Sequence, residues 1–215
     1  KGLARTECTA VRAGRERGAQ EQTRESDYYP GYSDVGIVVG VGEGVDGVAV
    51  GDRVLSAGGH ASHVVASVKS PYYAPVPAGA SPRDAAFGVI GMVAMHGARK
   101  AAVQIGEHTL VTGAGMVGQL VSQLLPRDAS ETLVVADLSE ARLALALELG
   151  ASHVVRPRDG DLAQAHREAA GHPADVVVEA TGYPELLPAV VDSLRVGGRC
   201  VLLGSIWHRP VTLDL

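Results

Sequence analysis

The sequence is short of cysteine, of aromatic residues and of positive charge. Only Cys8 and Cys200 are present, and they lie far apart, so neither a disulfide framework nor a cysteine-based metal cluster is expected. A net charge of −5 offers no basic stripe, and nucleic acid is therefore not an expected partner. Together these absences favour a cytoplasmic protein in a reducing compartment.

Long apolar runs are also missing. The longest candidate, residues 85–95, is well short of the roughly 20 residues that cross a bilayer, so no membrane association is expected. The first residues carry no apolar signal segment. With 46% hydrophobic and 20% charged residues, the 215-residue chain has the composition of a globular protein with a sizeable core.

Two regions of the sequence follow different patterns. Residues 1 to about 78 are rich in glycine and contain short alternating apolar stretches, which predict antiparallel strands that include 37–39 and 53–55. From about residue 80 the pattern changes to alternating strands and helices. Ser81, Pro82 and Asp84 form a helix start with a capping serine, a proline at the first position and an early acid. We predict one helix from Pro82 to about Ala102.

The second region predicts a parallel sheet covered by helices on both faces, which is a doubly wound α/β fold of six strands or nearly so. Strands are expected at 109–112, 132–136, 152–155, 175–179 and 199–203. Helices are expected at 116–125, 139–149, 161–170 and 184–194.

A glycine-rich turn follows the first of these strands and opens the first of these helices. In the stretch Gly113-Ala114-Gly115-Met116-Val117-Gly118, Gly113 permits a tight turn, Gly115 lets backbone approach a pyrophosphate, and Gly118 lets helix and strand pack closely. Such a motif alone is weak, but the strand before it and the helix after it are the required context. The alternative is a nucleotide-free sheet with a chance glycine turn.

An acid ends the next strand, about 20 residues beyond the motif. Asp137 is placed to accept hydrogen bonds from the adenosine ribose and to repel the extra phosphate of NADP. Arg142 either lies beside that ribose or offsets the charge of Asp137. The sequence therefore predicts NAD(H) as the cofactor, with NADP(H) less favoured.

The chain resembles the medium-chain dehydrogenase/reductase superfamily, and within it the threonine, polyol and bacteriochlorophyllide dehydrogenase-like branch. The motifs that carry the resemblance are 30–32 with 35–36, 41–45, 50–54, 149–151, 179–182, 197–199 and 203–205, and for the branch 13–18 and 59–63. The resemblance implies a partial GroES-like catalytic domain over 1–80 and a Rossmann domain over 81–215. It also implies that both ends of the chain look cut, because the catalytic domain normally takes strands from both.

The resemblance assigns further residues to the cofactor site. Thr181 belongs to it, and the turn Leu203-Gly204-Ser205 lies against the nicotinamide. A homodimer is expected, with the apolar alternation at Val211-Thr212-Leu213 suited to an edge strand that pairs across a two-fold axis.

The zinc ligands of the family are absent from their matched positions. Arg12 stands at the first cysteine position, Tyr32 at the histidine, Ser33 at the adjacent glutamate, and Val89 near the remaining cysteine. No cysteine occurs between 56 and 82, where the structural-zinc lobe would lie. His60 and His63 are three apart in a strand-like stretch, which would put them on opposite faces. We therefore expect no metal site.

Without a metal, another group must stabilise a developing oxyanion. Arg12 is a candidate for that charge, while Tyr32 and His60 are candidates to donate or remove a proton. The plain alternative is that Arg12 is a surface residue, Tyr32 packs in a wall and His60 caps a strand.

The expected activity is zinc-independent, NAD(H)-dependent hydride transfer to or from a carbonyl or alcohol of a small-molecule substrate. Two alternatives stay open: a nucleotide-binding protein without catalysis, and an NADPH-dependent quinone or enone reductase.

Overall fold

The computed structural model describes residues 1–10, 30–125, 129–157, 162–204 and 210–213. The chain divides into two compact units, Lys1–Met92 and Val93–Leu215, called here the N-terminal and C-terminal units. The division falls within a helix, and the predicted domain boundary between residues 80 and 81 stays a prediction. No helix in the described ranges is long and apolar enough to cross a membrane.

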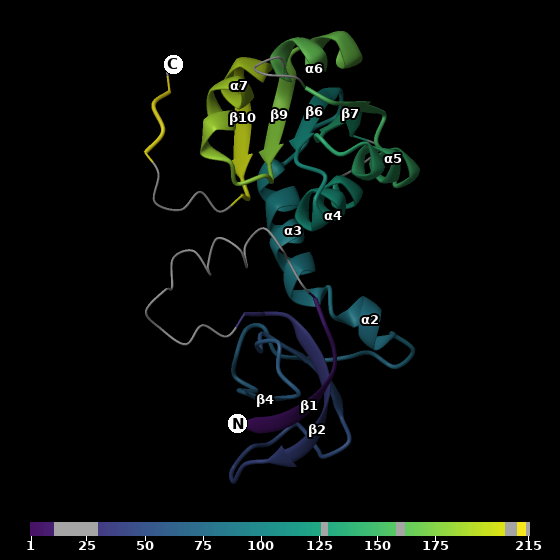
Figure 1. Ribbon diagram of the computed structural model, residues 1–215, viewed down its shortest axis with the longest axis vertical. Helices are drawn as coiled ribbons and strands as arrows, with labels where there is room; N and C mark the ends of the chain where they lie inside the picture. Colours follow the sequence, from purple (N-terminus) through teal and green to yellow (C-terminus); the bar gives the residue numbers. More distant parts are fainter. Residues whose placement is uncertain (11–29, 126–128, 158–161, 205–209, 214–215) are drawn as a thin grey trace. The chain divides into compact units, whose positions relative to one another are not determined.

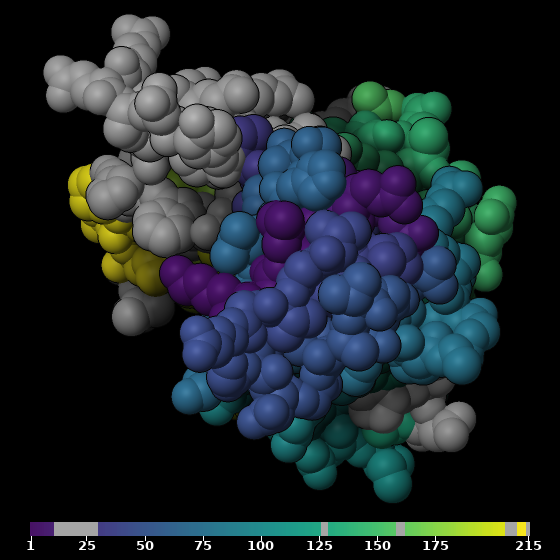
Figure 2. Space-filling view, turned by 90° about the horizontal axis from the view of Figure 1, so that it is seen from below, coloured from purple at the N-terminus to yellow at the C-terminus, as the bar shows by residue number. Residues whose placement is uncertain are grey.

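The N-terminal unit is built on a five-stranded antiparallel sheet in the order β4-β1-β2-β3-β5. Its strands are β1 (Gly2–Thr9), β2 (Asp34–Val41), β3 (Arg53–Ser56), β4 (His63–Ala66) and β5 (Ala74–Pro75). Figure 2 looks onto this unit, and the purple atoms of the first residues lie among the blue atoms of the strands that flank them. The predicted strands at 37–39 and 53–55 are confirmed as parts of β2 and β3.

The predicted helix from Pro82 is wrong in its continuity. It begins as expected, because the Ser81 hydroxyl accepts a hydrogen bond from the Asp84 amide at 3.1 Å. The chain then forms two helices, α2 (Pro82–Ala85) and α3 (Gly88–Ala101). At the break, the Ser33 hydroxyl donates to the Ala86 carbonyl at 2.6 Å. A bond from the residue before β2 thus satisfies a carbonyl at the break, which helical periodicity alone cannot reveal.

The C-terminal unit is a parallel sheet in the order β10-β9-β6-β7-β8, with helices on both faces (Figure 1). Its strands are β6 (Glu107–Thr112), β7 (Ser130–Ala136), β8 (His153–Val155), β9 (Ala174–Glu179) and β10 (Leu194–Leu202). The other elements are α4 (Met116–Leu124), α5 (Glu140–Glu148), α6 (Leu162–Ala170), the 3₁₀ turn η1 (Pro184–Leu186) and α7 (Leu187–Ser193). The described residues of the C-terminal unit thus contain five strands, one fewer than the full prediction of six.

Alternate residues of the central strands face two separate cores. Val111 and Val135 pack with α3 and α4 on one face. Their neighbours Leu110 and Val134 pack with α6 and α7 on the other. Strands buried on both faces explain the nearly continuous apolar runs in the sequence, as expected of a parallel sheet.

An ion pair joins elements that are far apart in the sequence. Arg199 of β10 donates to both carboxylate oxygens of Glu107 at 2.9 and 2.5 Å, and to the carbonyls of Ala101 and Ala102 at 3.2 Å each. The same guanidinium therefore holds the start of β6 and the end of α3. The Arg199 hydrogen bond lowers the pKa of the Glu107 carboxyl below its ordinary value of 4.5.

Replacing Arg199 with alanine is expected to lower the free energy of unfolding at pH 7 by about 1–2 kcal/mol, because four charged hydrogen bonds are lost from a partly exposed site. Since the folded-state pKa of Glu107 is depressed, this stabilisation is present above pH 4.5 and is lost as the pH falls through the lower value. Urea unfolding of both proteins at pH 7 and pH 3 measures the difference. Arg156→Ala, which breaks an exposed pair with Glu140, is the control and should have little effect.

Candidate functional site

The glycine-rich turn joins β6 to α4 at the carboxyl edge of the parallel sheet. Gly113 has a φ of +89°, and its amide donates to the Ala136 carbonyl of β7 at 2.7 Å. Gly115 caps α4 without a side-chain hydrogen bond, and Met116 and Val117 are the first residues of the helix. The amide groups of this first turn are the kind of donors that bind phosphate oxygens.

The spacing of glycines matches the steric needs of a pyrophosphate cradle. A Cβ atom placed on Gly118 would lie 1.7 Å from the Gly113 carbonyl oxygen, so only glycine lets the helix approach the turn this closely. A Cβ atom on Gly115 would meet nothing within 4 Å, so that side of the turn is open. The described residues therefore fit a dinucleotide, because α4 packs tightly against the turn at Gly118 while the space next to Gly115 is open.

Asp137, directly after β7, is tied to the turn. One of its carboxylate oxygens accepts from the Ala114 amide at 2.7 Å, and the other accepts from the Ser139 amide at 2.8 Å. A carboxylate has about four lone-pair sites, so two acceptor positions are left for ribose hydroxyls. The acid predicted to bind the ribose is thus held by backbone hydrogen bonds beside the turn from Gly113 to Gly118, which is called the phosphate turn below.

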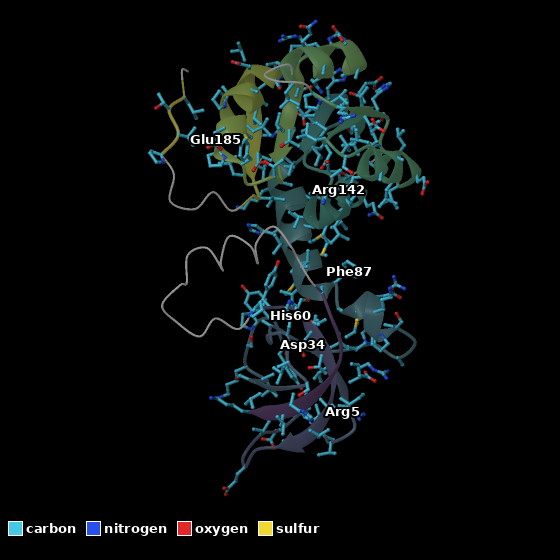
Figure 3. The ribbon with its side chains drawn as sticks, in the orientation of Figure 1. Arg5, Asp34, His60, Phe87, Arg142 and Glu185 are labelled. Atoms are coloured by element: carbon cyan, nitrogen blue, oxygen red, sulfur yellow. The ribbon has the colours of Figure 1, made fainter. Side chains whose placement is uncertain are left out.

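Arg142 lies next to this acid. Its guanidinium is 3.7 Å from a carboxylate oxygen of Asp137, with the Arg142 side chain 58% exposed and that of Asp137 10%. The Gln119 side-chain amide of α4 donates to the Arg142 carbonyl at 2.8 Å and so holds the start of α5 against α4. Arg142 is labelled in the C-terminal unit in Figure 3. The structure contains the pairing of Arg142 with Asp137, and the position beside the ribose stays a prediction.

The other predicted cofactor residues lie beyond the ends of β9 and β10. Thr181 borders the phosphate turn, because a Cβ atom on Gly113 would lie 2.9 Å from its methyl group. The amides of Leu203 and Gly204 donate to the Glu179 carbonyl at 2.8 and 2.9 Å. Ser205 lies outside the described residues. Three loops of the predicted site therefore meet at one edge of the sheet.

Sequence reasoning did not single out Glu179, which lies at the centre of these loops. Its side chain is fully buried and bonds to the backbone or hydroxyl groups of Thr181 and Gly182. The sequence signal was an acid ending a run of three valines. A charged residue at the end of a buried strand is uncommon unless it is paired or hydrogen-bonded.

In the N-terminal unit, His60 is held by Thr9. The Thr9 hydroxyl donates to the Ser33 carbonyl at 3.0 Å and lies 2.6 Å from Nδ1 of His60. The Thr9 hydroxyl thus links the His60 ring to the backbone at Ser33. His60 precedes β4, so the prediction that it shares a strand with His63, on the opposite face, was wrong.

Tyr32 is half-buried on the segment that packs against His60. The His60 amide donates to the Pro30 carbonyl at 2.7 Å, and a Cβ atom on Gly31 would lie 2.5 Å from the His60 nitrogen. The backbone thus brings the segment with Tyr32 to the His60 loop. Arg12, the third catalytic candidate, lies outside the described residues.

A buried carboxylate near His60 was also missed. Asp34 accepts from the Ser56 hydroxyl at 2.6 Å and from the Gly58 amide at 2.9 Å (Figure 3). Burial raises the pKa of Asp34, while the bonds from Ser56 and Gly58 and the nearby His60 act against that rise. Asp34 therefore anchors the loop that carries His60.

Comparison with known proteins agrees with this architecture. A model of the zinc-binding dehydrogenase family matches residues 116–215. The chain is 30% identical to D-guloside 3-dehydrogenase of Escherichia coli over 166 residues, which cover 76% of this chain and 47% of that protein. It is 28% identical to (R,R)-butanediol dehydrogenase of Bacillus subtilis over 83% of this chain and 59% of that protein. The chain belongs to the medium-chain dehydrogenase/reductase superfamily.

Solved structures of other proteins show the same fold. Benzyl alcohol dehydrogenase of Acinetobacter calcoaceticus matches with a TM-score of 0.85 at 18% identity, over all of this chain and 72% of that one. A Sinorhizobium meliloti protein bound to NADP matches with a TM-score of 0.86 at 23% identity, over 99% of this chain and 72% of that one. The Rossmann-type prediction is confirmed. This superfamily member spans about half the length of the curated relatives that it matches.

Two residues at the matched zinc positions of this superfamily member have structural roles in the described part of the chain. The Ser33 hydroxyl donates to the Ala86 carbonyl, and the Val89 side chain is buried. Within the described ranges, no three His, Cys, Asp or Glu side chains converge on a metal position. Arg12 is not among those residues.

Proposed function

We propose that the protein is an NAD(H)-dependent oxidoreductase that acts on the alcohol or carbonyl group of a small molecule without a catalytic zinc. The observation that carries the proposal is the phosphate turn with Asp137 bonded to it, because this pairing suits an adenosine ribose and a pyrophosphate together. The relatives are named for oxidation or reduction at hydroxyl-bearing carbons, which supports the alcohol or carbonyl class.

The cofactor, when bound, supplies the hydride chemistry. Gly113 to Gly118, Asp137, Thr181 and the Leu203–Ser205 turn would hold it. Of the chain's own groups, the His60 ring, bonded to Thr9, and the Tyr32 hydroxyl are proposed to donate or remove a proton. Arg12 is proposed to supply the fixed positive charge that zinc provides in other family members. A homodimer belongs to the same proposal, although Val211–Leu213 is not in a strand in this single chain.

NADP(H) is the second candidate cofactor, and with it a quinone or enone reductase. The supporting observation is the exposed Arg142 guanidinium beside Asp137, since an arginine at this place can bind a 2′-phosphate. The Asp137 carboxylate argues for NAD(H), because it opposes that phosphate at short range.

Purified protein is expected to oxidise or reduce the dinucleotide with members of a panel of secondary alcohols, polyols and ketones, and a chelator should leave the rate unchanged. Absorbance at 340 nm follows turnover, and metal analysis should find no stoichiometric zinc. Arg12→Ala should slow turnover while cofactor affinity stays nearly constant. Binding without turnover across alcohols, ketones and enones would instead support a non-catalytic nucleotide-binding protein, and stoichiometric zinc would contradict the metal-free proposal.

A further inference from the structure

Glu179 is a buried carboxylate whose contacts are with neutral donors. Its Oε1 atom accepts from the Thr181 amide at 2.6 Å, from the Gly182 amide at 3.1 Å and from the Thr181 hydroxyl. Its Oε2 atom lies 3.2 Å from the Gly182 amide. In the part of the chain that the structure describes, no salt bridge reaches it. Every group that contacts the two carboxylate oxygens in these bonds is therefore a hydrogen-bond donor.

The backbone of the same residue holds a second loop. The amides of Leu203 and Gly204 both donate to the Glu179 carbonyl oxygen. A Cβ atom on Gly204 would lie 2.4 Å from Oε2 of Glu179 and 2.1 Å from the Gly182 nitrogen. One residue thus fixes the loop after β9 with its side chain and the loop after β10 with its carbonyl, and the two loops touch.

The strand order places these loops relative to a bound dinucleotide. In the order β10-β9-β6-β7-β8, the phosphate turn follows the central strand β6 and Asp137 follows β7. A dinucleotide crosses the carboxyl edge at the point where the strand order reverses, with the pyrophosphate at the helix start. If Asp137 takes the adenosine ribose, the other half must extend over the ends of β9 and β10, above Glu179.

We propose that Glu179 is a positioning residue that also sets the redox-state preference of the cofactor site: it fixes both loops and places a buried negative charge beneath the nicotinamide half. The proposal rests on the proposed function. The oxidised nicotinamide ring is positively charged and the reduced ring is neutral, so a fixed anion below it favours the oxidised dinucleotide.

A neighbouring thiol reports the same charge. Cys200 pairs with Val177 in the parallel register and therefore shares a sheet face with Glu179, one pleat away. Cys200 is exposed as a residue, but its sulfur lies partly covered at the sheet. That partial burial, and after it the negative charge of Glu179, raises the pKa of the Cys200 thiol to about 11. Removing the charge should increase the thiolate fraction, and with it the rate at which iodoacetamide alkylates Cys200.

The test is titration of the full chain with NAD⁺ and with NADH separately, in the wild type, Glu179→Gln and Thr181→Val. Glu179→Gln keeps an acceptor oxygen but no charge, and should weaken NAD⁺ binding about tenfold more than NADH binding. Thr181→Val removes one donor and keeps the charge, so it should weaken both forms by the same factor. Alkylation of Cys200 at pH 8.5, located by peptide mass, should be faster in Glu179→Gln.

The outcomes separate cleanly. An unchanged ratio of the two dissociation constants in a folded Glu179→Gln protein overturns the inference, as does an unchanged alkylation rate of Cys200. A ratio that shifts in a folded Thr181→Val protein also overturns it, because the carboxylate charge is retained in that variant and cannot be the cause of the shift. A wild type that binds neither dinucleotide contradicts the proposed function instead.

Discussion

Gly118→Ala is expected to destabilise the C-terminal unit by about 3 kcal/mol, because the added methyl carbon would lie 1.7 Å from the Gly113 carbonyl oxygen. Neither the methyl group nor the Gly113 carbonyl can move away without a shift of the backbone, because the Gly113 amide is itself bonded to the Ala136 carbonyl. The unfolding midpoint in urea measures the loss. Dinucleotide binding should disappear with it, because the helix can no longer pack against the turn.

Gly115→Ala is the matched control for this effect. Its φ of −73° suits any residue, and its Cβ position is open. Stability should therefore stay within about 0.5 kcal/mol of the wild type. Dinucleotide affinity should still fall about tenfold or more, because the methyl group would occupy space that a pyrophosphate needs. Wild-type affinity in a folded Gly115→Ala protein would show that the ligand does not approach this turn.

Asp137→Asn is expected to weaken NAD⁺ binding by about 10- to 100-fold, the loss that follows from removing charged hydrogen bonds to ribose hydroxyls. NADP⁺ binding should weaken less or improve, because the repulsion of its 2′-phosphate is removed. Calorimetric titration with each cofactor gives both dissociation constants. The Ala114 and Ser139 amides lose part of their carboxylate partner, so thermal unfolding should be measured alongside.

Arg142→Ala is the companion variant. It removes the cation that lies 3.7 Å from Asp137 and leaves the carboxylate in place. We expect NAD⁺ affinity to change by no more than a few-fold and NADP⁺ affinity to fall. If NADP⁺ binds the wild type more tightly than NAD⁺, and Arg142→Ala reverses that order, then Arg142 rather than Asp137 determines cofactor choice.

Local signals in the sequence predicted the elements on which the proposed cofactor site is built. The turn from Gly113 to Gly118 is specified by residues within six positions of one another, and Asp137 follows from the end of the next strand. The alternation of Leu110 and Val111, and of Val134 and Val135, likewise follows from a strand with a period of two. These features need no knowledge of distant partners, because backbone stereochemistry and side-chain periodicity act over a few residues.

Contacts between distant residues were not predictable in this way. His60 bonds to Thr9 across 51 positions, and Arg199 reaches Glu107 across 92. At the break between α2 and α3, the Ala86 carbonyl accepts from Ser33, which is 53 positions away. None of these pairings leaves a periodic trace, because each hydrogen bond forms only when the fold brings its two groups within about 3 Å.

The sequence by itself therefore determined the fold class: a parallel sheet with a glycine-rich turn after its first strand, an acid after the next strand, and an antiparallel region before them. Only the tertiary structure decided which groups hold these parts in place. The phosphate turn is fixed by the Asp137 carboxylate, and the loops after β9 and β10 are fixed by Glu179. Buried carboxylates must find donors when the chain folds, and which donors they find is set by packing rather than by neighbours in the sequence.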